Sequence, residues 1–554
     1  MSLKERISKI INNHIYYYYN NDGSVNKIIS AIKILLSDSF DDYSINGRIT
    51  SIDEKHEINN NIDSLAKINE KENRRKKEGV YYTDTDVTNC IAANAVIHYI
   101  NPDDDKIYSY DKALTILNQL SKKQKEIVIF SKVFDPTCGT GEFLLSILKI
   151  KIFLCQSIEC GNLYICCNSI FGNDISVQST DISKIRLFFM LVNCIGIDID
   201  GYINTIANNI KRNFSNFDAV SHIGHKHGNM DIIVGNPPYV EYRHYSGKTK
   251  YDYGNIYADV LHNSIDNLSN NGVISFVIPL SYVSTKRMSK LRGYVKDKMD
   301  KQIVVNFADR PDSLFSGVHQ KLTILIASKN SIYNGVLSSS YKYWYQVERQ
   351  NLFDNISIIP TIIDNEDYWP KIGNEIEKSI YNKMKYFDGI DISSLPVSFR
   401  GYKSIYINLR ACFWMKVFIE DTGTSSYTEI KVPFEFQAFI YCLLNSSFFF
   451  LLWIIISDGW HITNKEIMFI NIPKQIKRYN VWELHMHRLI ERLEDTKVFV
   501  NTKQVLYEYK HKKCKDVIDR IDYELAKVYG LSETELAYIK SFALKYRISD
   551  GTKG

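Results

Sequence analysis

Short apolar runs and helical patterns follow one another through the middle of the chain. Buried strands are predicted for the runs rich in branched and aromatic residues, at 133–135, 170–175, 232–234, 273–279, 303–307 and 322–326. Residues 87–100, 144–153 and 181–192 carry apolar residues at helical spacing and predict helices before and between the first strands. Because strand, turn and helix recur in this order, residues 76–335 are predicted to form an α/β domain with a mostly parallel sheet.

The pattern changes on either side of this segment. Residues 1–48 carry isoleucine and leucine at helical spacings and residues 50–75 are polar, so 1–75 is predicted to be an N-terminal helical extension with a linker. From about residue 336, long polar and aromatic stretches lack the strand–turn–helix order. We therefore expect residues 336–554 to form a separate C-terminal domain that ends in helices.

One stretch in this C-terminal part is apolar enough to raise the question of a membrane. Residues 438–457 contain no charged side chain, and residues 448–456 are all apolar. Asn445, Ser446 and Ser447 interrupt the stretch, and polar groups are costly inside a bilayer. The pattern favours a buried helical hairpin over a membrane span.

Composition narrows the class of protein only slightly. A chain of 554 residues is long enough for two or three domains, and a net charge of +5 permits a nucleic-acid partner without arguing for one. Half of the 10 cysteines fall between residues 155 and 194, with neither a C-x2-C pair nor a histidine among them. Reduced thiols are therefore favoured over a zinc site, and with no apolar signal segment at the N-terminus we expect a cytoplasmic protein.

The strand predicted at 232–234 ends in an unusual turn. Gly235 is followed by Asn236, two prolines and Tyr239, and consecutive prolines stop a strand and fix an extended turn. The turn would lie at the carboxyl end of a strand, where open α/β sheets bind ligands. The Asn236 side-chain oxygen and the Pro237 carbonyl oxygen could together hold one amino group, while Tyr239 offers a flat face for stacking. The turn predicts a pocket for an exocyclic amine of a nucleobase.

Several motifs give the chain a family resemblance. Asn-Pro-Pro-Tyr at 236–239 resembles the catalytic motif of S-adenosylmethionine-dependent amino-methyltransferases, above all adenine-N6 DNA methyltransferases. Residues 135–143 resemble the methionine-binding loop of that family, and residues 79–83 resemble its N-terminal cofactor motif, although Asp84 replaces the usual proline. With the C-terminal region, the order of motifs resembles the gamma group of restriction–modification systems, including the methylase half of Type IIG enzymes. The resemblance implies a Rossmann-like methyltransferase domain followed by a DNA target-recognition domain.

The resemblance also implies a role for each motif. Catalysis is expected from Asn236, Pro237, Pro238 and Tyr239. The cofactor S-adenosyl-L-methionine is expected to contact Tyr82, Thr83, Asp135, Thr137, Gly139, Gly141, Phe143, Asp174, Ile175, Asn213 and Phe214. In this arrangement Asp135 engages the ammonium group, Asp174 the ribose hydroxyls and Ile175 the adenine ring of the cofactor. Phe315 is expected to stack on the substrate base opposite Tyr239, and no metal is expected.

The activity implied is site-specific methylation of DNA. The methyl group of S-adenosylmethionine would move to the N6 amino group of an adenine flipped out of double-stranded DNA. Only about 75 residues precede the cofactor motifs and they show no nuclease pattern, so we expect modification only, with a cognate restriction endonuclease as a candidate partner. Three alternatives stay open: a protein-glutamine methyltransferase, a ribosomal-RNA amino-methyltransferase, and a non-catalytic DNA-binding relative.

Overall fold

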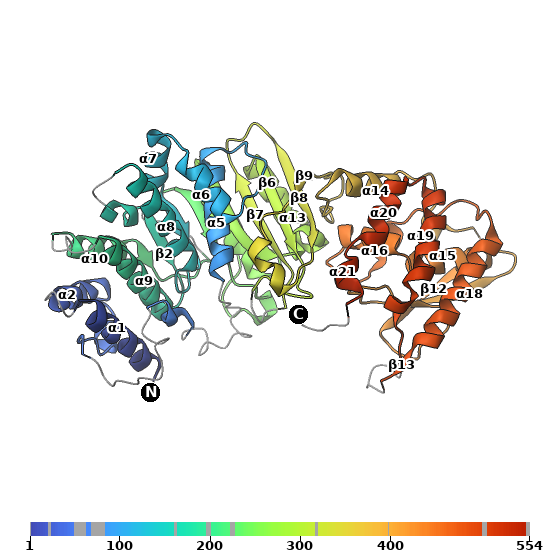
Figure 1. The fold of residues 1–554 in the computed structure, drawn as a ribbon, viewed down its shortest axis with the longest axis horizontal. Coiled ribbons are helices and arrows are strands. Elements are labelled where there is room, and N and C mark those ends of the chain that lie inside the picture. The colour runs from blue at the N-terminus through green and yellow to red at the C-terminus, as the bar shows by residue number, and fades with distance from the viewer. Residues whose placement is uncertain are drawn as a thin grey trace.

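A nine-stranded sheet forms the centre of the molecule (Figure 1). Its strands are β1 (Val133–Asp135), β2 (Ile170–Asn173), β3 (Phe214–Ser215), β4 (Met230–Gly235), β5 (Leu268–Pro279), β6 (Lys301–Phe307), β7 (Leu322–Ser328), β8 (Gly335–Lys342) and β9 (Ile358–Pro360). The structure is a computed structural model that describes residues 2–19, 24–48, 62–67, 84–159, 163–195, 201–221, 228–315, 319–396, 398–500 and 507–549.

The strands lie in the order β3-β2-β1-β4-β5-β7-β6-β8-β9. Neighbours from β3 to β5 pair in parallel, and β7 runs antiparallel between β5 and β6. This arrangement confirms the predicted Rossmann-like, mostly parallel sheet, in which all carboxyl ends of the first five strands meet at one edge.

The sheet extends beyond the predicted domain boundary at residue 335. Strand β8 pairs in parallel with β6, and β9 pairs with β8. Three consecutive serines interrupt the apolar pattern of β8, so the sequence pattern does not predict a strand here. Two of them, Ser338 and Ser339, are buried and bond to the side chain or backbone of Asn306, so their polar groups are satisfied inside the sheet.

Helices cover both faces of the sheet. They are α5 (Thr85–Ile100), α6 (Tyr110–Asn118), α7 (Lys122–Phe130), α8 (Glu142–Ser157), α9 (Val177–Ile195), α10 (Ile203–Arg212), α11 (Ile256–Asp266), α12 (Ser281–Ser284) and α13 (Ser289–Lys298). Side chains of a strand alternate between faces. Ile232 and Val234 accordingly join the apolar cluster of α5, α8 and α9, whereas Ile233 joins that of α11 and α13.

The N-terminal helices pack on the outer end of the sheet domain. Helix α2 (Val25–Leu35) lies against α9 and α10, and helix α1 (Leu3–Tyr19) packs on α2 and contacts α9. The Tyr19 hydroxyl donates to the side chain of Asn193, and the Ser39 hydroxyl donates to the buried Asp181 at 2.6 Å. The predicted N-terminal helical extension is therefore present.

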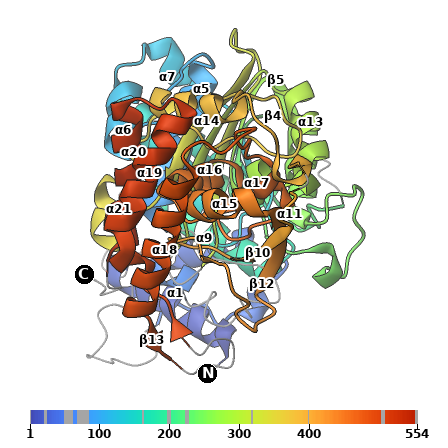
Figure 2. The same cartoon turned by 90° about the vertical axis from the view of Figure 1, so that its right-hand side faces the viewer.

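The C-terminal part is a largely helical body beside β8 and β9 (Figures 1 and 2). Its elements are α14 (Glu375–Lys385), β10 (Tyr402–Asn408), β11 (Val417–Phe418), β12 (Tyr427–Pro433), α15 (Gln437–Leu444), α16 (Ser447–Ile456), α17 (Asn464–Met468), α18 (Tyr479–Thr496), β13 (Val498–Phe499), β14 (Tyr507–Glu508), α19 (Lys515–Tyr529), α20 (Glu533–Ser541) and α21 (Leu544–Arg547). Helices α18, α19 and α20 pack in sequence against one another.

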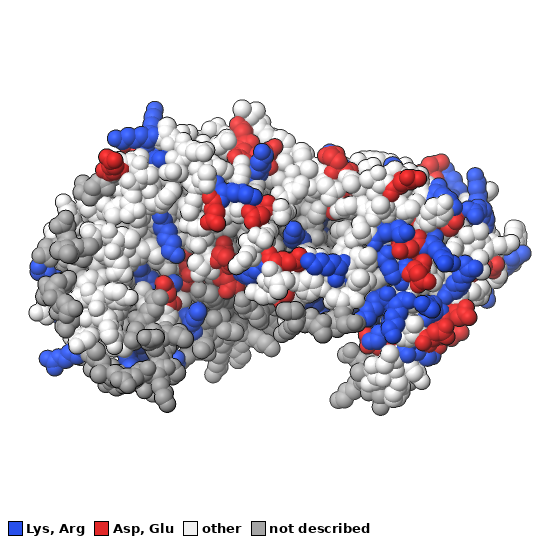
Figure 3. All heavy atoms as spheres, viewed as in Figure 1, with Lys and Arg blue, Asp and Glu red and all other residues white. Residues whose placement is uncertain are grey.

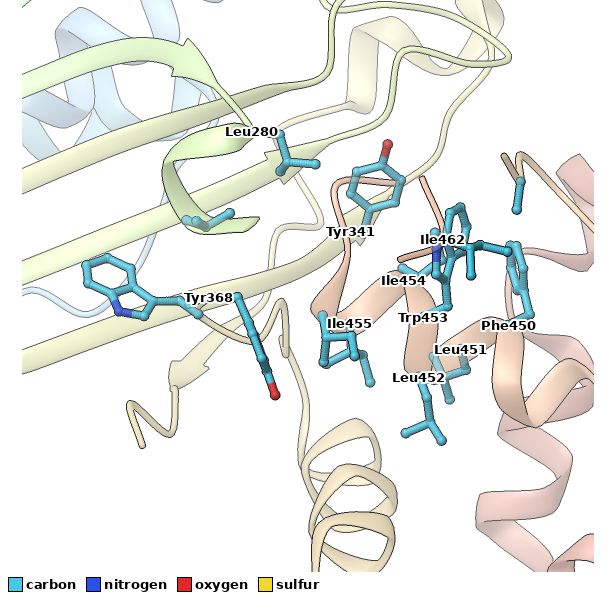
Figure 4. Packing of buried hydrophobic residues seen from close by; sticks show 14 of the residues in the cluster. Leu280, Tyr341, Tyr368, Phe450, Leu451, Leu452, Trp453, Ile454, Ile455 and Ile462 are labelled. Atoms are coloured by element: carbon cyan, nitrogen blue, oxygen red, sulfur yellow. The ribbon is translucent and has the colours of Figure 1, made fainter. Parts of the chain in front are cut away.

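The apolar stretch forms a bent helix pair in the interior. Helices α15 and α16 meet at 71°, and every residue of both except Gln437 is buried. The predicted burial is thus confirmed, but the two helices meet in a bend rather than as an antiparallel hairpin. Ser446 caps α16 by accepting from the Phe449 amide, and α16 side chains lie beside Tyr341 of β8 and Tyr368 (Figure 4). Among the described residues no single helix is long and apolar enough to cross a membrane, although this bent pair meets the length and composition criteria.

Candidate active site

Three predicted motifs meet at the carboxyl edge of the sheet. Asp135 ends β1, Asp174 follows β2 and Asn236 follows β4. The register aligns Asp135 with Gly172 and Phe134 with Ile233, so the three strand ends lie side by side. Adjacent strands are about 4.8 Å apart. Side chains from all three can therefore reach one ligand.

A glycine-bearing loop joins β1 to α8 at this edge. Gly139 and Gly141 adopt φ values of 52° and 91°, which favour glycine over residues with a Cβ. A Cβ on Gly141 would also lie 2.4 Å from the Ser183 hydroxyl. The Asp174 carboxylate accepts from the amides of Gly139 and Ser176, both at 2.9 Å. Asp174, which is expected to bind the ribose of the cofactor, thus also holds the glycine-bearing loop in place.

The loop contains polar groups that lack a full set of partners. Asp135 is 1% exposed and accepts from the Thr137 amide at 3.0 Å. The hydroxyl oxygen of Thr137 is buried and has no hydrogen-bond partner within the described part of the chain. Burial raises the pKa of Asp135 well above its ordinary value, and burial also raises the pKa of Asp174. A ligand that brings an ammonium group and hydroxyls would satisfy these acids.

An ion pair missed from the sequence supports the same loop. Arg186 of α9 donates to the Thr140 carbonyl at 2.7 Å and to the Glu142 carboxylate at 2.5 Å. Both charged side chains are buried. Sequence alone gives no sign of this pair, because 44 residues separate its members.

Other expected cofactor contacts have different surroundings. The Ile175 side chain, next to Asp174, is 71% exposed, so it is accessible to a flat ring. Phe143, in contrast, is buried in the core. Tyr82 and Thr83 lie outside the described residues. Helix α5, which follows them, begins at Thr85 with Asp84 as its N-cap residue.

The structure places Asn213 away from this edge. Its amide nitrogen donates to the carbonyl oxygens of Cys167, Asn168 and Ile170, which lie at the start of β2. Phe214 packs beside Gly172, where a Cβ would come within 2.5 Å of its ring. Both residues therefore support the strands rather than the ligand edge.

A second Asn-Phe pair lies at the carboxyl end of β3. The Asn216 amide nitrogen donates to the Asp174 carbonyl at 2.8 Å, and the Phe217 amide donates to the Asn173 side chain at 3.0 Å. The two Asn-Phe pairs are three positions apart in the sequence. Because β3 has only two residues, the sequence pattern does not show which of the two pairs follows the carboxyl end of the strand.

The Asn-Pro-Pro-Tyr turn is half-buried. Asn236, Pro238 and Tyr239 are partly exposed, and Pro237 is buried. The Tyr239 hydroxyl lies within hydrogen-bond distance of the Asn236 side-chain oxygen and is 3.0 Å from the Val277 carbonyl oxygen of β5. The Tyr257 ring meets Tyr239 edge-on, with ring centroids 6.4 Å apart.

Phe315 is fully buried in the structure, in the apolar cluster against which Tyr239 also packs. It is 0% exposed and belongs to the apolar core cluster together with Leu314. The expected second wall of the base pocket is therefore corrected: Phe315 is a core residue here, because its ring is buried against the sheet. No group of histidine, cysteine and carboxylate side chains suited to a metal ion occurs among the described residues.

Comparisons with known proteins find relatives for part of the chain. Residues 168–313 match the family described as Eco57I restriction-modification methylase. The chain is also 26% identical over 247 residues to the Type II methyltransferase M.CvrRI of Paramecium bursaria Chlorella virus XZ-6E, a match that covers 40% of this chain and 54% of that protein. It thus spans about half the length of this curated relative.

Solved structures show distant similarity in fold. The Type IIL restriction-modification enzyme MmeI in complex with DNA is 13% identical with a TM-score of 0.45, covering 88% of this chain and 81% of that one. The Type IIG restriction endonuclease BpuSI is 13% identical with a TM-score of 0.42, covering 98% and 76%. The sequence and family matches confirm the resemblance to restriction–modification methylases.

Proposed function

We propose that this chain, which resembles restriction–modification methylases over residues 168–313, methylates the N6 amino group of adenine in double-stranded DNA. One observation carries the proposal: the Asn236–Tyr239 turn and the glycine loop of β1–α8 share one edge of the sheet. An acceptor pair for an amino group thus lies beside a loop suited to an amino-acid ligand.

The residues of the loop fit S-adenosylmethionine. The buried Asp135 carboxylate would accept from the ammonium group, and the unpartnered Thr137 hydroxyl would bond to the amino-acid end. The donors of the α8 N-terminus, which begins after Gly141, favour the carboxylate. Asp174 would accept from the ribose hydroxyls and Ile175 would lie against the adenine ring. When bound, the cofactor supplies an electrophilic methyl group.

The turn would activate the amino group of the substrate. The adenine amino lone pair is delocalised into the ring, which makes it a weak nucleophile. The Asn236 side-chain oxygen and the Pro237 carbonyl oxygen would each accept a hydrogen bond from the amino group. These two bonds would favour a pyramidal nitrogen whose lone pair points at the methyl group. Fixed acceptors stabilise the positive charge that develops there, and the shared edge supplies proximity. Tyr239 would stack on the base, which must leave the duplex to reach this edge.

The C-terminal part is proposed to recognise the DNA sequence. Figure 3 shows lysine and arginine side chains gathered over α18 and α19. Arg488 and Arg492 of α18 and Arg520 of α19 are exposed. Exposed cations of this kind bind phosphates and release counterions. A cytoplasmic enzyme of this role would be paired with a restriction endonuclease that cleaves the same sequence.

Methyl transfer to DNA tests the proposal directly. The purified chain is incubated with methyl-labelled S-adenosylmethionine and unmodified bacterial DNA, and nucleosides are separated by mass spectrometry. We expect labelled N6-methyl-2′-deoxyadenosine. Long-read sequencing of the treated DNA should place the modification at a single recognition sequence. In parallel incubations with ribosomal RNA or with a release-factor protein in place of DNA, label in the RNA or in a protein glutamine would overturn the choice of substrate. Cofactor binding without any transfer would indicate the non-catalytic alternative.

A further inference from the structure

A turn of the C-terminal body lies on the carboxyl edge of the sheet. Strand β6 runs parallel to β4 and β5, because β7 pairs antiparallel with both β5 and β6. The residues that follow β6 and those that precede β7 therefore emerge at the edge that carries Asn236. The turn at 457–461, which follows α16, packs there: a Cβ on Gly459 would lie 2.9 Å from the Tyr341 hydroxyl and 3.3 Å from the Lys321 side chain. The two parts of the chain thus meet at the edge of the proposed active site.

The 457–461 turn is held in one conformation by its own hydrogen bonds. The Asp458 side chain accepts from the amides of Trp460 and His461, both at 2.8 Å, and lies 2.6 Å from the His461 Nδ1 atom. Lys371 is 1% exposed and donates to the Ser457 carbonyl at 2.6 Å. A turn fixed in this way presents its outward side chains in a defined direction.

Two cations from the β6–β7 connection lie over the Trp460 ring. The Arg310 guanidinium is 5.0 Å from the ring centre and the Lys321 ammonium is 5.1 Å from it. Lys321 pairs with Asp309 at 3.2 Å, and the two side chains are 15% and 10% exposed. Arg310, in contrast, is exposed, and none of the ion pairs among the described residues includes it. Its charge is therefore held on an aromatic face without being neutralised by a carboxylate.

A second exposed arginine lies on the other side of the turn. Arg410 forms an antiparallel bridge with His461, and the neighbouring Ala411 amide donates to the Trp460 carbonyl at 2.9 Å. Arg410 is exposed and, like Arg310, belongs to none of the ion pairs that the described part of the chain forms. Each part of the chain thus supplies one exposed arginine beside this turn.

The distance to the proposed acceptors suits a DNA backbone. Strands β5 and β7 lie between β4 and β6, so Arg310 is about 14 Å from Asn236 across the sheet, at about 4.8 Å per strand. The major groove of B-DNA is about 12 Å wide. A duplex that places one base at Asn236 would therefore bring backbone phosphates to the 457–461 turn. A guanidinium matches a phosphate with two parallel N–H groups.

We propose that Arg310 and Arg410, set in place by the 457–461 turn, bind the phosphate backbone of DNA beside the extruded base. The inference rests on the proposed function, since DNA is the partner concerned. The nearby acids do not oppose it, because Asp309 is paired with Lys321 and Asp458 is bonded to donors of its own turn. DNA held by the C-terminal body would thereby be aligned with the acceptors of the sheet domain.

Fluorescence anisotropy with a labelled duplex of mixed sequence tests the contact in the full chain. Arg310→Met and Arg410→Met should each weaken binding about tenfold, the effect of losing a charge-assisted contact. Each should also reduce the slope of log affinity against log salt concentration by about 0.9, the value for one phosphate contact. Arg212→Met is the matched control, since Arg212 is exposed and precedes β3, at the opposite edge of the sheet. It should bind the duplex as the parent does.

Trp460 tests whether Arg310 is positioned by the turn. Trp460→Leu should weaken duplex binding about 2- to 5-fold, because Arg310 loses its aromatic face. Trp460→Phe keeps such a face and should restore most of the affinity. In the Arg310→Met background, Trp460→Leu should have little further effect, since the two residues act together. In methylation assays Arg310→Met should raise the KM for DNA and change kcat only within a few-fold.

The outcomes separate this inference from the proposed function. A parental salt slope in either arginine variant overturns the inference, even where affinity falls, because no phosphate contact was then lost. Binding of S-adenosylhomocysteine serves as the check on folding. If Arg310→Met loses it, Arg410→Met, on the other part of the chain, decides the outcome. A parent chain that binds S-adenosylhomocysteine but no duplex overturns the proposed action on DNA and this inference with it.

Discussion

The hydroxyl of Tyr239 lies between the side-chain oxygen of Asn236 and the carbonyl oxygen of Val277. A phenol has one proton, so it donates to one of these oxygens at a time. Donation to Val277 leaves the Asn236 oxygen to accept from an amino group. The proposed catalytic acceptor and the proposed stacking ring are therefore coupled through a single proton.

Tyr239→Phe tests this coupling. The variant keeps the aromatic face but loses the hydroxyl, so methylation should fall less than about tenfold and stability by about 1 kcal/mol. Tyr239→Ala should lose more activity, because stacking contributes about 1–3 kcal/mol per base. Initial rates at saturating cofactor and thermal unfolding measure both effects. Equal rates for the two variants would show that the ring does not stack.

Asn236→Ala removes one of the two proposed acceptors. Methylation should be abolished, while S-adenosylhomocysteine affinity should stay within a few-fold of the parent because the glycine loop is unchanged. Single-turnover rates and calorimetry separate the two quantities. Near-parental transfer would exclude Asn236 from the chemistry.

Asp174 offers a graded test of the cofactor site. Its carboxylate already accepts from the Gly139 and Ser176 amides, so Asp174→Ala removes loop support as well as the ribose contact. We expect S-adenosylhomocysteine to bind about 10- to 150-fold more weakly. Asp174→Asn keeps an acceptor oxygen and should lose less. If both variants bind as the parent does, the ribose acid lies elsewhere.

Asp135→Asn should separate stability from binding. Burial raises the pKa of Asp135, so the folded chain holds this proton more tightly than the unfolded chain does. Stability from this group is present at low pH and is lost as pH rises from the unfolded pKa towards the raised folded value. The neutral variant should therefore unfold at the same or a higher temperature than the parent at pH 7, yet bind the cofactor more weakly. A lower melting temperature of the variant at pH 7 would contradict the expectation that the ionised Asp135 carboxylate destabilises the folded chain.

Phe315→Ala should act on stability. Removing a fully buried phenylalanine costs about 3–5 kcal/mol through lost burial and the cavity left behind. Denaturant unfolding measures this loss. A 2-aminopurine reporter at the target position should be quenched by the variant as by the parent. A selective loss of quenching without loss of stability would return Phe315 to the base pocket.

The sequence predicts the sheet well wherever a strand is apolar. Strands β1, β2 and β4 to β7 all lie where branched and aromatic residues cluster. Strand β5 begins at Leu268, before the predicted start at residue 273, and so includes the polar residues Asn270 and Asn271. Strand β8 was missed because its buried serines are satisfied by Asn306, a partner that only the folded chain brings near.

Site residues divide in a similar way. Contiguous motifs such as 135–143 and 236–239 define their own geometry and were located correctly at the carboxyl edge, although their roles stay predictions. Asn213 was assigned beside a two-residue strand, where a shift of three residues moves a side chain to the other end of the strand. Phe315 lies in the connection between β6 and β7, where no local pattern distinguishes a core aromatic from a stacking one. Contacts such as Arg349 with Asp86 join residues more than 250 positions apart and leave no local pattern.

The continuation of the sheet through β8 and β9 restricts how such enzymes can be recombined. A cut at residue 335 would separate β8 from β6 and leave one side of β6 as an unpaired edge. Exposed strand edges and apolar surface both promote aggregation. A chimera that exchanges the C-terminal body should therefore place its junction after Pro360 and before α14, so that the sheet stays whole, and its new helices must offer an apolar surface to Tyr341 of β8.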